Sequence, residues 1–332
     1  MLCNPDAWGR PADCRADNSW SGSAELDKVS RARIVSLTIV CMVAFASNSV
    51  LARVALKHTA IDAASFTAIR LVSGAVVLML LLRASRQRGG DQGSWWSGAA
   101  LFAYAAAFSF AYASLPTATG ALLLFGAVQA TMIFYGLWIG ERLLKLQLAG
   151  LVLAFAGLLL LFLPGLSTTP PLASALLMIG AGMCWGIYSL RGKGVGAPLA
   201  ATAGNFLRAS AFTVVLSLLL LDRISLDMLG VGYAVVSGAL TSGLGYVIWY
   251  TVMPALKATN AAIVQLSVPV IAAAGGIVLL GESITVRLAL ASIAILGGIA
   301  LVIVRKRPAH LSGQAAAADT PVRDGLVISS KK

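Results

Sequence analysis

Two arginines, Arg70 and Arg208, lie deep inside long apolar stretches of the sequence, seven and nine residues from the start of each stretch. At about 1.5 Å per helical residue, both would lie within a few Å of the midplane of a bilayer. A guanidinium does not readily lose its proton, and holding it there costs from about 3 to more than 10 kcal/mol. Each arginine must therefore face protein or water, and could present a bidentate fork to a carboxylate or another anionic group.

A polar residue accompanies each arginine at helical spacing. Thr67 precedes Arg70 by three residues and Asn205 precedes Arg208 by three, so each pair shares a helix face. We expect the two patches to face one another across a cavity if the two halves of the chain are related by symmetry. The thirteen acidic residues lie at span ends or in the tails and loops, which leaves carbonyls, water or a ligand as partners. The alternative is that these polar side chains only tie neighbouring helices together.

Five further polar or aromatic side chains within apolar stretches are candidates to line the same cavity, although the last of them could instead anchor the bundle. They are Tyr104, Gln129, Asn48, Gln265 and Trp185. The two histidines lie outside the stretches, and the sequence has no HExxH motif, P-loop or dinucleotide fingerprint. We therefore expect neither an enzyme nor a bound metal or cofactor.

The composition indicates that the elements carrying these residues are membrane helices. Of the 332 residues, 58% are apolar and 11% charged, against about 45–50% and 25% in soluble proteins. Ten apolar stretches approach the roughly 20 residues that cross 30 Å of hydrocarbon. They are 34–52, 63–82, 95–115, 117–139, 146–163, 172–190, 199–221, 228–253, 258–280 and 288–304. The predicted fold is an all-α membrane bundle of ten transmembrane helices.

The charges predict the orientation of this bundle. The net charge is +12, and most of the 25 Lys and Arg fall in loops that share one side of the membrane with both termini. Cytoplasmic loops carry such an excess, so both termini are predicted to be cytoplasmic in an inner-membrane protein. Nucleic-acid binding is then not needed to explain the charge. The tail 1–32 lacks the pattern of a removable signal peptide, and the tail 305–332 is expected to be disordered.

An internal repeat divides the spans into two halves, 33–163 and 172–304. The segments GERL at 140–143 and GESI at 281–284 match at an offset of 141 residues, with Gly157 and Gly298 in register downstream. Because each half has five spans, an odd number, the second half must be inverted relative to the first. Inverted halves can open a shared midplane cavity alternately to either side.

The paired Gly-Glu motifs, each opening a last helix that contains glycine, resemble the EamA-type repeats of the drug/metabolite transporter superfamily. The resemblance covers roughly residues 33–304 and implies ten helices, cytoplasmic termini and secondary transport of small metabolites, often export. The sequence departs from the repeat at Pro269, where the first half has Val128. Pro269 is expected to bend the ninth span. Glu141 and Glu282 are expected to complement the N-terminal dipole of each last helix, with proton coupling as the alternative.

Together these features predict a secondary carrier that moves an amino acid or related carboxylate through a midplane cavity, with export implied by the resemblance. Its expected partners are the small-molecule substrate and the lipid bilayer, while the oligomeric state stays open. Two other classes also stay open. An anion-selective channel could use the same arginines, and a lipid-handling or structural membrane protein would need no soluble substrate.

Overall fold

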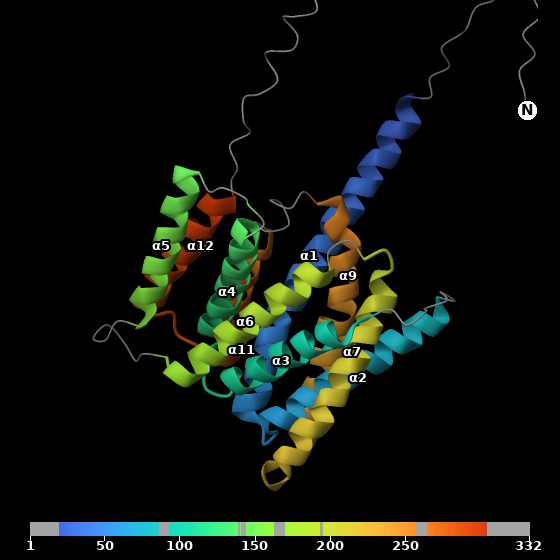
Figure 1. The fold of residues 1–332 in the computed structure, drawn as a ribbon, viewed down its shortest axis with the longest axis vertical. Coiled ribbons are helices and arrows are strands. Elements are labelled where there is room, and N and C mark those ends of the chain that lie inside the picture. The colour runs from blue at the N-terminus through green and yellow to red at the C-terminus, as the bar shows by residue number, and fades with distance from the viewer. Residues whose placement is uncertain are drawn as a thin grey trace, which may run out of the picture.

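The structure is a computed structural model, and every element in the part of the chain that it describes is helical (Figure 1). The described residues are 20–85, 93–138, 140, 144–162, 170–192, 195–256 and 264–303. Residues 1–19 and 304–332, and with them all of the predicted C-terminal tail, lie outside this description. The first helix begins at Trp20, well inside the predicted N-terminal tail.

The helices of the first half follow the predicted stretches closely. They are α1 (Trp20–His58), α2 (Ala63–Ala84), α3 (Trp95–Tyr112), α4 (Thr117–Trp138) and α5 (Lys145–Phe162). The second half comprises α6 (Leu172–Gly192), α7 (Pro198–Leu219), η1 (Leu221–Arg223), α8 (Met228–Val236), η2 (Ser237–Leu244), α9 (Gly245–Val252), η3 (Met253–Ala255), α11 (Ser267–Leu280) and α12 (Val286–Ile303). The run from α8 to η3 corresponds to one predicted stretch, and its middle part, η2, is a π-helix.

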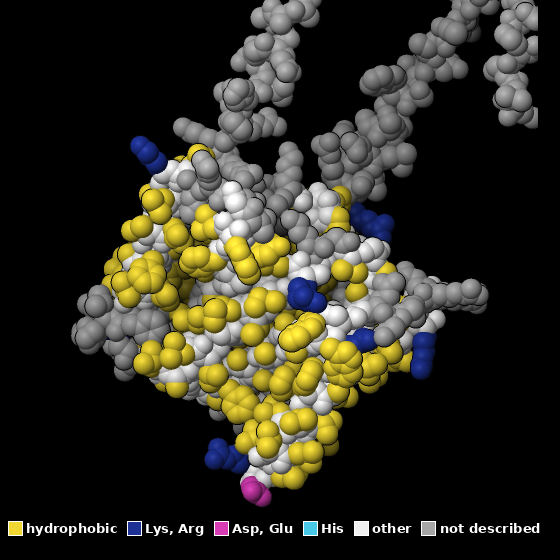
Figure 2. All heavy atoms as spheres, viewed as in Figure 1, with side chains coloured by type: hydrophobic (Ala, Val, Ile, Leu, Met, Phe, Trp, Pro, Cys, Tyr) yellow, Lys and Arg dark blue, Asp and Glu magenta, His cyan; other side chains and the backbone are white. Residues whose placement is uncertain are grey.

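Six helical segments are long and apolar enough to cross a membrane. They are Ala32–His58, Ala63–Ala84, Thr117–Trp138, Leu172–Gly192, Pro198–Leu219 and Met228–Ala255. Shorter apolar helices occupy Lys145–Leu160, Ser267–Leu280 and Val286–Leu301. Hydrophobic side chains spread over the face seen in Figure 2, with only scattered Lys and Arg. The chain is therefore an integral membrane protein whose apolar outer surface suits hydrocarbon.

The most extensive helix contacts join the two halves of the chain. α5 packs on α12, α3 on α6, α4 on α6 and α11, and α2 on α7 and η2. α1 packs on α11, α9 and η2. In Figure 1 the α5–α12 pair lies to one side of the bundle, next to α4. The start of α1 and the end of α12 lie at the same end of the bundle.

Glycine allows the close approach of α5 and α12. A Cβ on Gly298 would lie 2.5 Å from the carbonyl oxygen of Gly150, and one on Gly157 would lie 2.7 Å from Cβ of Ala294. The two glycines matched by the repeat thus both lie in this interface. The neighbouring Gly297 has open space where its Cβ would be.

These two glycines give a matched pair of variants. We expect Gly298→Leu to destabilise the protein by roughly 1–3 kcal/mol, because the added side chain must push the helices apart. Gly297→Leu should change the stability little. Thermal unfolding of the detergent-solubilised protein measures both, and equal midpoints for the two variants would contradict the packing described here.

Pro269 lies just after a break in the helical run of the ninth span. It lies in the first turn of α11, which begins at Ser267. A proline in the first turn removes no intrahelical hydrogen bond, because the amide there has no partner within the helix. The helical run of the ninth span is interrupted at Leu266, one turn before the proline, because residues 264 and 265 are helical and α11 begins only at Ser267.

Asp62 caps α2 and also ties the two halves together. Its Oδ1 accepts hydrogen bonds from the amides of Ala64 and Ser65, each 2.9 Å, and its Oδ2 accepts one from the amide of Ser225 at 2.9 Å. Burial alone would raise the pKa of this carboxyl, but the hydrogen bonds to Ser65, Ser225 and Ala64 outweigh burial and hold the pKa below its ordinary value of 3.8.

The lowered pKa predicts a pH-dependent contribution to stability. The ionised carboxylate stabilises the fold fully above about pH 4, and this contribution is lost as the pH falls through the folded-state pKa. We expect Asp62→Asn to destabilise the protein by about 0.5–1 kcal/mol at pH 7, and the gap to narrow at pH 3. Unfolding midpoints at the two pH values measure it, with Asp222→Asn at an exposed site as the control. A gap independent of pH would contradict the assignment.

Candidate functional site

Arg70 lies at the centre of a buried polar cluster built by both halves of the chain. Its side chain is 1% exposed. Nε donates to Oγ of Ser242 at 3.0 Å, and Nη2 donates to the hydroxyls of Tyr104 at 3.1 Å and Tyr246 at 3.4 Å. These partners come from η2, α3 and α9, while Arg70 belongs to α2. We call these residues, with Asn48, the Arg70 cluster.

One nitrogen of the Arg70 guanidinium is available to donate a hydrogen bond to a further partner. Its Cζ lies 4.8 Å from the ring centroid of Phe108 and 5.3 Å from that of Tyr104, so both rings offer π-electron density to the cation. Nη1 is buried and has no hydrogen-bond partner. No acidic side chain of the described residues pairs with Arg70. The site is therefore a desolvated positive charge with an unfilled donor, which an anion would complete.

The π-helix η2 supplies hydroxyls to the same cluster. Oδ1 of Asn48 accepts hydrogen bonds from Ser237 at 2.6 Å and Thr241 at 3.3 Å, and Nδ2 donates to the hydroxyl of Tyr104 at 3.4 Å. A π-helix has a wider turn, with hydrogen bonds between residues five apart, which brings Ser237 and Ser242 closer to one face than in an α-helix. The widened turn thus lets η2 contact Asn48 of α1 and Arg70 of α2 together.

A small chamber lies beside this cluster. It has a volume of about 10 Å³ and is lined by Phe45, Asn48, Ser49, Tyr104, Phe108, Leu124, Phe125, Trp185 and Tyr246. That volume is about enough for one water molecule. Trp185 closes the chamber, because its ring centroid lies 4.5 Å from that of Tyr246 and 5.1 Å from that of Tyr104. Three predicted cavity residues, Asn48, Tyr104 and Trp185, therefore meet at one place next to Arg70.

Arg208 lies elsewhere in the bundle. Its Nη1 donates to the carbonyl of Gly204 at 3.1 Å, and its Cζ lies 5.8 Å from the ring centroid of Trp95. A Cβ on Gly98 would lie 2.8 Å from Cβ of Arg208, so α7 packs closely against the start of α3 here. The expectation that the two arginine patches face one another across a cavity is therefore wrong for this structure.

Asn205 braces neighbouring helices, whereas Thr67 bonds within its own helix. Oδ1 of Asn205 accepts a hydrogen bond from the amide of Ser94 at 3.0 Å, and Nδ2 donates to the hydroxyl of Tyr188 at 3.5 Å. The hydroxyl of Thr67 donates to the carbonyl of Ala63 at 2.7 Å. Asn205 thus joins α7 to α6 and the start of α3, and Thr67 satisfies its hydroxyl within its own helix.

Three other buried polar side chains do not line the chamber. Nε2 of Gln129 and Oε1 of Gln265 lack hydrogen-bond partners, although the two side chains are only 2% and 3% exposed. Arg287 lies in the first turn of α12 and is 2% exposed. Its three guanidinium nitrogens have no hydrogen-bond partner. The structure does not bring these three residues into the Arg70 cluster.

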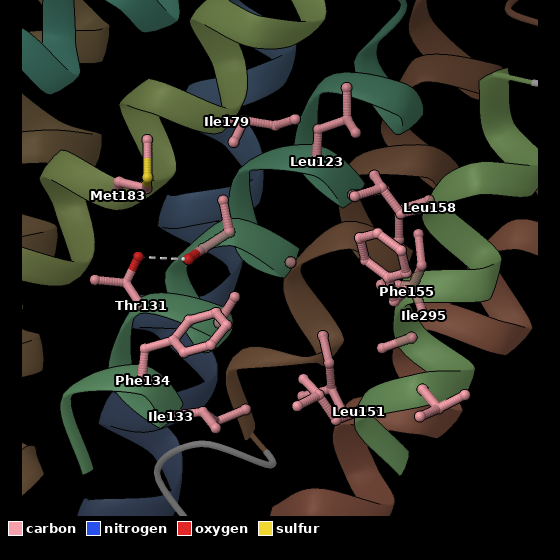
Figure 3. Close-up of a pocket in the computed structure, with 17 residues that line it drawn as sticks. Leu123, Thr131, Ile133, Phe134, Leu151, Phe155, Leu158, Ile179, Met183 and Ile295 are labelled. Atoms are coloured by element: carbon pink, nitrogen blue, oxygen red, sulfur yellow. Dashed lines mark hydrogen bonds between the residues drawn. The ribbon is translucent and has the colours of Figure 1, made fainter. Parts of the chain in front are cut away.

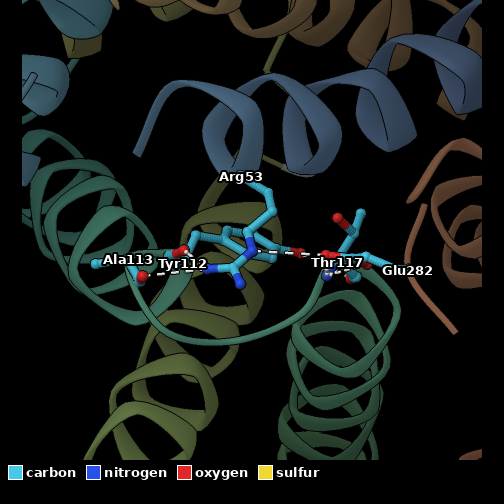
Figure 4. A network of polar contacts seen from close by, with 5 residues as sticks. All are labelled: Arg53, Tyr112, Ala113, Thr117 and Glu282. Carbon is cyan, nitrogen blue, oxygen red and sulfur yellow. Dashed lines mark hydrogen bonds and ion pairs between the residues drawn. The ribbon is translucent and has the colours of Figure 1, made fainter. Parts of the chain in front are cut away.

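A second polar network, which the sequence did not predict, joins residues of α1, of the α3–α4 connection and of the segment before α12 (Figure 4). Nη1 of Arg53 donates to the carbonyls of Tyr112 at 2.9 Å and Ala113 at 3.1 Å, and its Nε lies 3.5 Å from Oε1 of Glu282. The amide of Thr117 donates to Oε2 of Glu282 at 2.8 Å and to Oε1 at 3.1 Å. We call this the Arg53–Glu282 network.

Glu282 therefore caps a helix other than the one that the sequence assigned to it. Helix α12 begins four residues later, at Val286, where the hydroxyl of Thr285 accepts a hydrogen bond from the amide of Leu288 at 3.2 Å. The carboxylate instead stabilises the N-terminus of α4, in the other half of the chain. Glu141 lies outside the described residues.

Comparisons with known proteins identify the family. The model of the EamA-like transporter family matches residues 32–163 and 172–304. The chain is 55% identical over 272 residues to a Pseudomonas aeruginosa protein named Uncharacterized protein PA1977, covering 82% of this chain and 94% of that one. A crystal structure described only as that of a protein shares the fold, with a TM-score of 0.59 at 18% identity over 82% of this chain and 97% of the other. The resemblance seen in the two Gly-Glu motifs is confirmed, and the chain belongs to the EamA-like transporter family.

Proposed function

We propose that this transporter is a secondary carrier in which two inverted five-helix halves enclose the Arg70 cluster and expose it alternately to either side. The pattern of helix contacts supports an internal twofold relation. In such a relation, α1 is equivalent to α6, α3 to the α8–α9 run, and α4 to α11. The contact between α4 and α6 then has the contact between α11 and α1 as its counterpart. The contact between α3 and α6 likewise has the contacts of α1 with α9 and η2 as its counterparts. All of these contacts are present in the structure.

The shared position of the chain ends supports an even number of crossings. The start of α1 and the end of α12 lie at one end of the bundle (Figure 1), as expected for ten spans. With the excess of Lys and Arg in the loops at that end, we assign both termini to the cytoplasm of an inner-membrane protein.

The proposed substrate is a small molecule with a carboxylate, such as an amino acid. The observation that carries this assignment is the unfilled Nη1 of a buried arginine that has no acidic partner in the described part of the chain. Phe108, Trp185 and Tyr246 would contact an apolar part of the same substrate. Export is the direction favoured by the resemblance to exporting members of the superfamily.

The closed chamber favours a carrier over an anion channel. A channel needs a continuous pore, whereas the space beside Arg70 holds only about 10 Å³. In the proposed orientation, the Arg53–Glu282 network closes the outer side, and Asp62 joins the two halves on that side through Ser225. These contacts must break for the outward-open state to form.

Reconstitution into liposomes tests the proposal. Vesicles loaded with one unlabelled carboxylate should take up the same labelled carboxylate faster than empty vesicles, and the flux should saturate. A panel of amino acids and other small carboxylates identifies the substrate, and protein-free vesicles give the background. Flux without saturation or counter-stimulation would favour a channel. Saturable flux of cations alone would contradict the substrate class.

A further inference from the structure

An apolar crevice separates α4 and α6 from the α5–α12 pair (Figure 3). Its volume is about 540 Å³, far larger than the chamber beside Arg70. Leu123, Ile133 and Phe134 of α4 form one wall, and Leu151 and Phe155 of α5 form the other. The crevice shares no lining residue with the chamber, so it is a separate feature of the molecule.

The lining of the crevice excludes a polar ligand. Of the 17 residues that line it, only Thr131 has a polar side chain, and its hydroxyl donates to the carbonyl of Ala127 at 2.8 Å. The remaining residues are aliphatic or aromatic, apart from Gly126 and the thioether of Met183. A water molecule would find almost no hydrogen-bond partners in such a space. If the space were empty, the side chains that line it would lose van der Waals contacts. The hydrocarbon of the surrounding bilayer is the matching occupant.

The dimensions fit one acyl chain better than a helix. Along α4 the lining runs from Leu122 to Phe134, which is about 18 Å at 1.5 Å per residue and slightly more than one leaflet. A helix about 10 Å wide would need roughly 1,400 Å³ over that length. An acyl chain about 4–5 Å wide needs roughly 300 Å³, because non-bonded carbons approach to 3.5–4.0 Å. The crevice therefore has ample room for an acyl chain, whereas a helix could enter it only in part.

A basic residue lies beyond one end of the crevice. Lys145, the exposed first residue of α5, precedes the lining residue Leu151 by six positions, or about 9 Å along the helix. A lysine at this position can extend its ammonium to the headgroup region. An anionic phospholipid would place its phosphate there with its chain in the crevice.

We propose that the crevice binds one acyl chain of an anionic phospholipid, held at the headgroup by Lys145. The bound chain fills the space between the main bundle and the α5–α12 pair. This site depends on residence in the membrane and is independent of the transported substrate.

Two matched glycine variants test the site. A Cβ on Gly126 would contact only Cγ2 of Ile295, at 3.7 Å, so Gly126→Leu puts a side chain into the crevice without displacing backbone. Gly232 of α8 has open space around its Cβ and lies outside the crevice, so Gly232→Leu is the control. Ala130→Leu is a second filling variant, in case Gly126→Leu unfolds.

The probe is a phosphatidylglycerol with a photoreactive acyl chain, in phosphatidylcholine vesicles that contain the full-length protein. After irradiation, mass spectrometry should locate adducts on the crevice residues of α4, α5 and α12. Gly126→Leu should reduce this label to the level of the other lipid-facing helices, while Gly232→Leu should leave it unchanged. A phosphatidylcholine probe should label the crevice about five-fold less, and Lys145→Gln should remove this preference.

Three results would overturn the proposal. Even labelling of all lipid-facing helices, insensitive to Gly126→Leu, would show that no chain is held. Equal labelling by the two probes would show that the site does not select an anionic headgroup. Cross-links between two copies of the chain that disappear in Gly126→Leu would assign the crevice to an interface between copies instead.

Discussion

Arg70→Lys should reduce counterflow of the carboxylate substrate about a hundredfold, corresponding to roughly 3 kcal/mol for lost charged hydrogen bonds. The variant keeps the positive charge but replaces the planar guanidinium, which donates in several fixed directions, by a compact ammonium group. Lysine cannot donate to Ser242, to the two tyrosine hydroxyls and to a substrate carboxylate together, as the geometry of Arg70 allows. Flux in proteoliposomes at limiting substrate concentration measures the effect.

Arg208→Lys is the matched control for this prediction. It makes the same chemical change in Arg208, the second arginine that the sequence places deep in a span, which lies beside Trp95 and outside the Arg70 cluster. We expect its transport to stay within a few-fold of the unsubstituted protein. An equal loss in both variants would favour the paired patches predicted from the sequence over the single site seen in the structure. Unfolding midpoints show whether either variant is misfolded.

The sequence predicted the helices well because span length and apolar composition are local properties. It also predicted that Asn48, Tyr104 and Trp185 would lie inside the bundle, since depth along a span follows from the rise per residue. It could not predict that Ser237 and Ser242 would reach the cluster, because a π-helical turn leaves no signature in the apolar pattern.

Depth along a span does not determine which neighbour a side chain meets, and this explains the two main corrections. Arg208 is as deep as Arg70 by residue count, but α7 crosses α3 where Gly98 leaves room for it. Glu282 precedes α12, yet the tertiary fold brings Thr117 of α4 to its carboxylate. Both outcomes depend on contacts between helices that are far apart in the sequence.

Glu282→Ala should open the chamber to the proposed outer side. The substitution removes both the carboxylate that caps α4 and the ionic partner of Arg53, and so weakens the contact between the halves at this end. Ser49, which is 1% exposed and lines the chamber, provides the reporter position. In a background without other cysteines, we expect Ser49→Cys to react slowly with a membrane-impermeant thiol reagent added from outside. A loss of about 1.5–3 kcal/mol from the closed state would raise this rate roughly ten- to a hundredfold.

Two controls separate opening from unfolding. Asp222→Ala removes an exposed carboxylate of η1 and should leave the labelling rate of Ser49→Cys unchanged. Glu282→Gln keeps an oxygen that can accept from the amide of Thr117 but loses the charge facing Arg53, so its rate should fall between those of the unsubstituted protein and Glu282→Ala. If all three variants label at the same rate, with unfolding midpoints unchanged, the Arg53–Glu282 network does not hold the outer side closed, and the barrier must lie in the apolar packing of Phe108, Leu124 and Phe125.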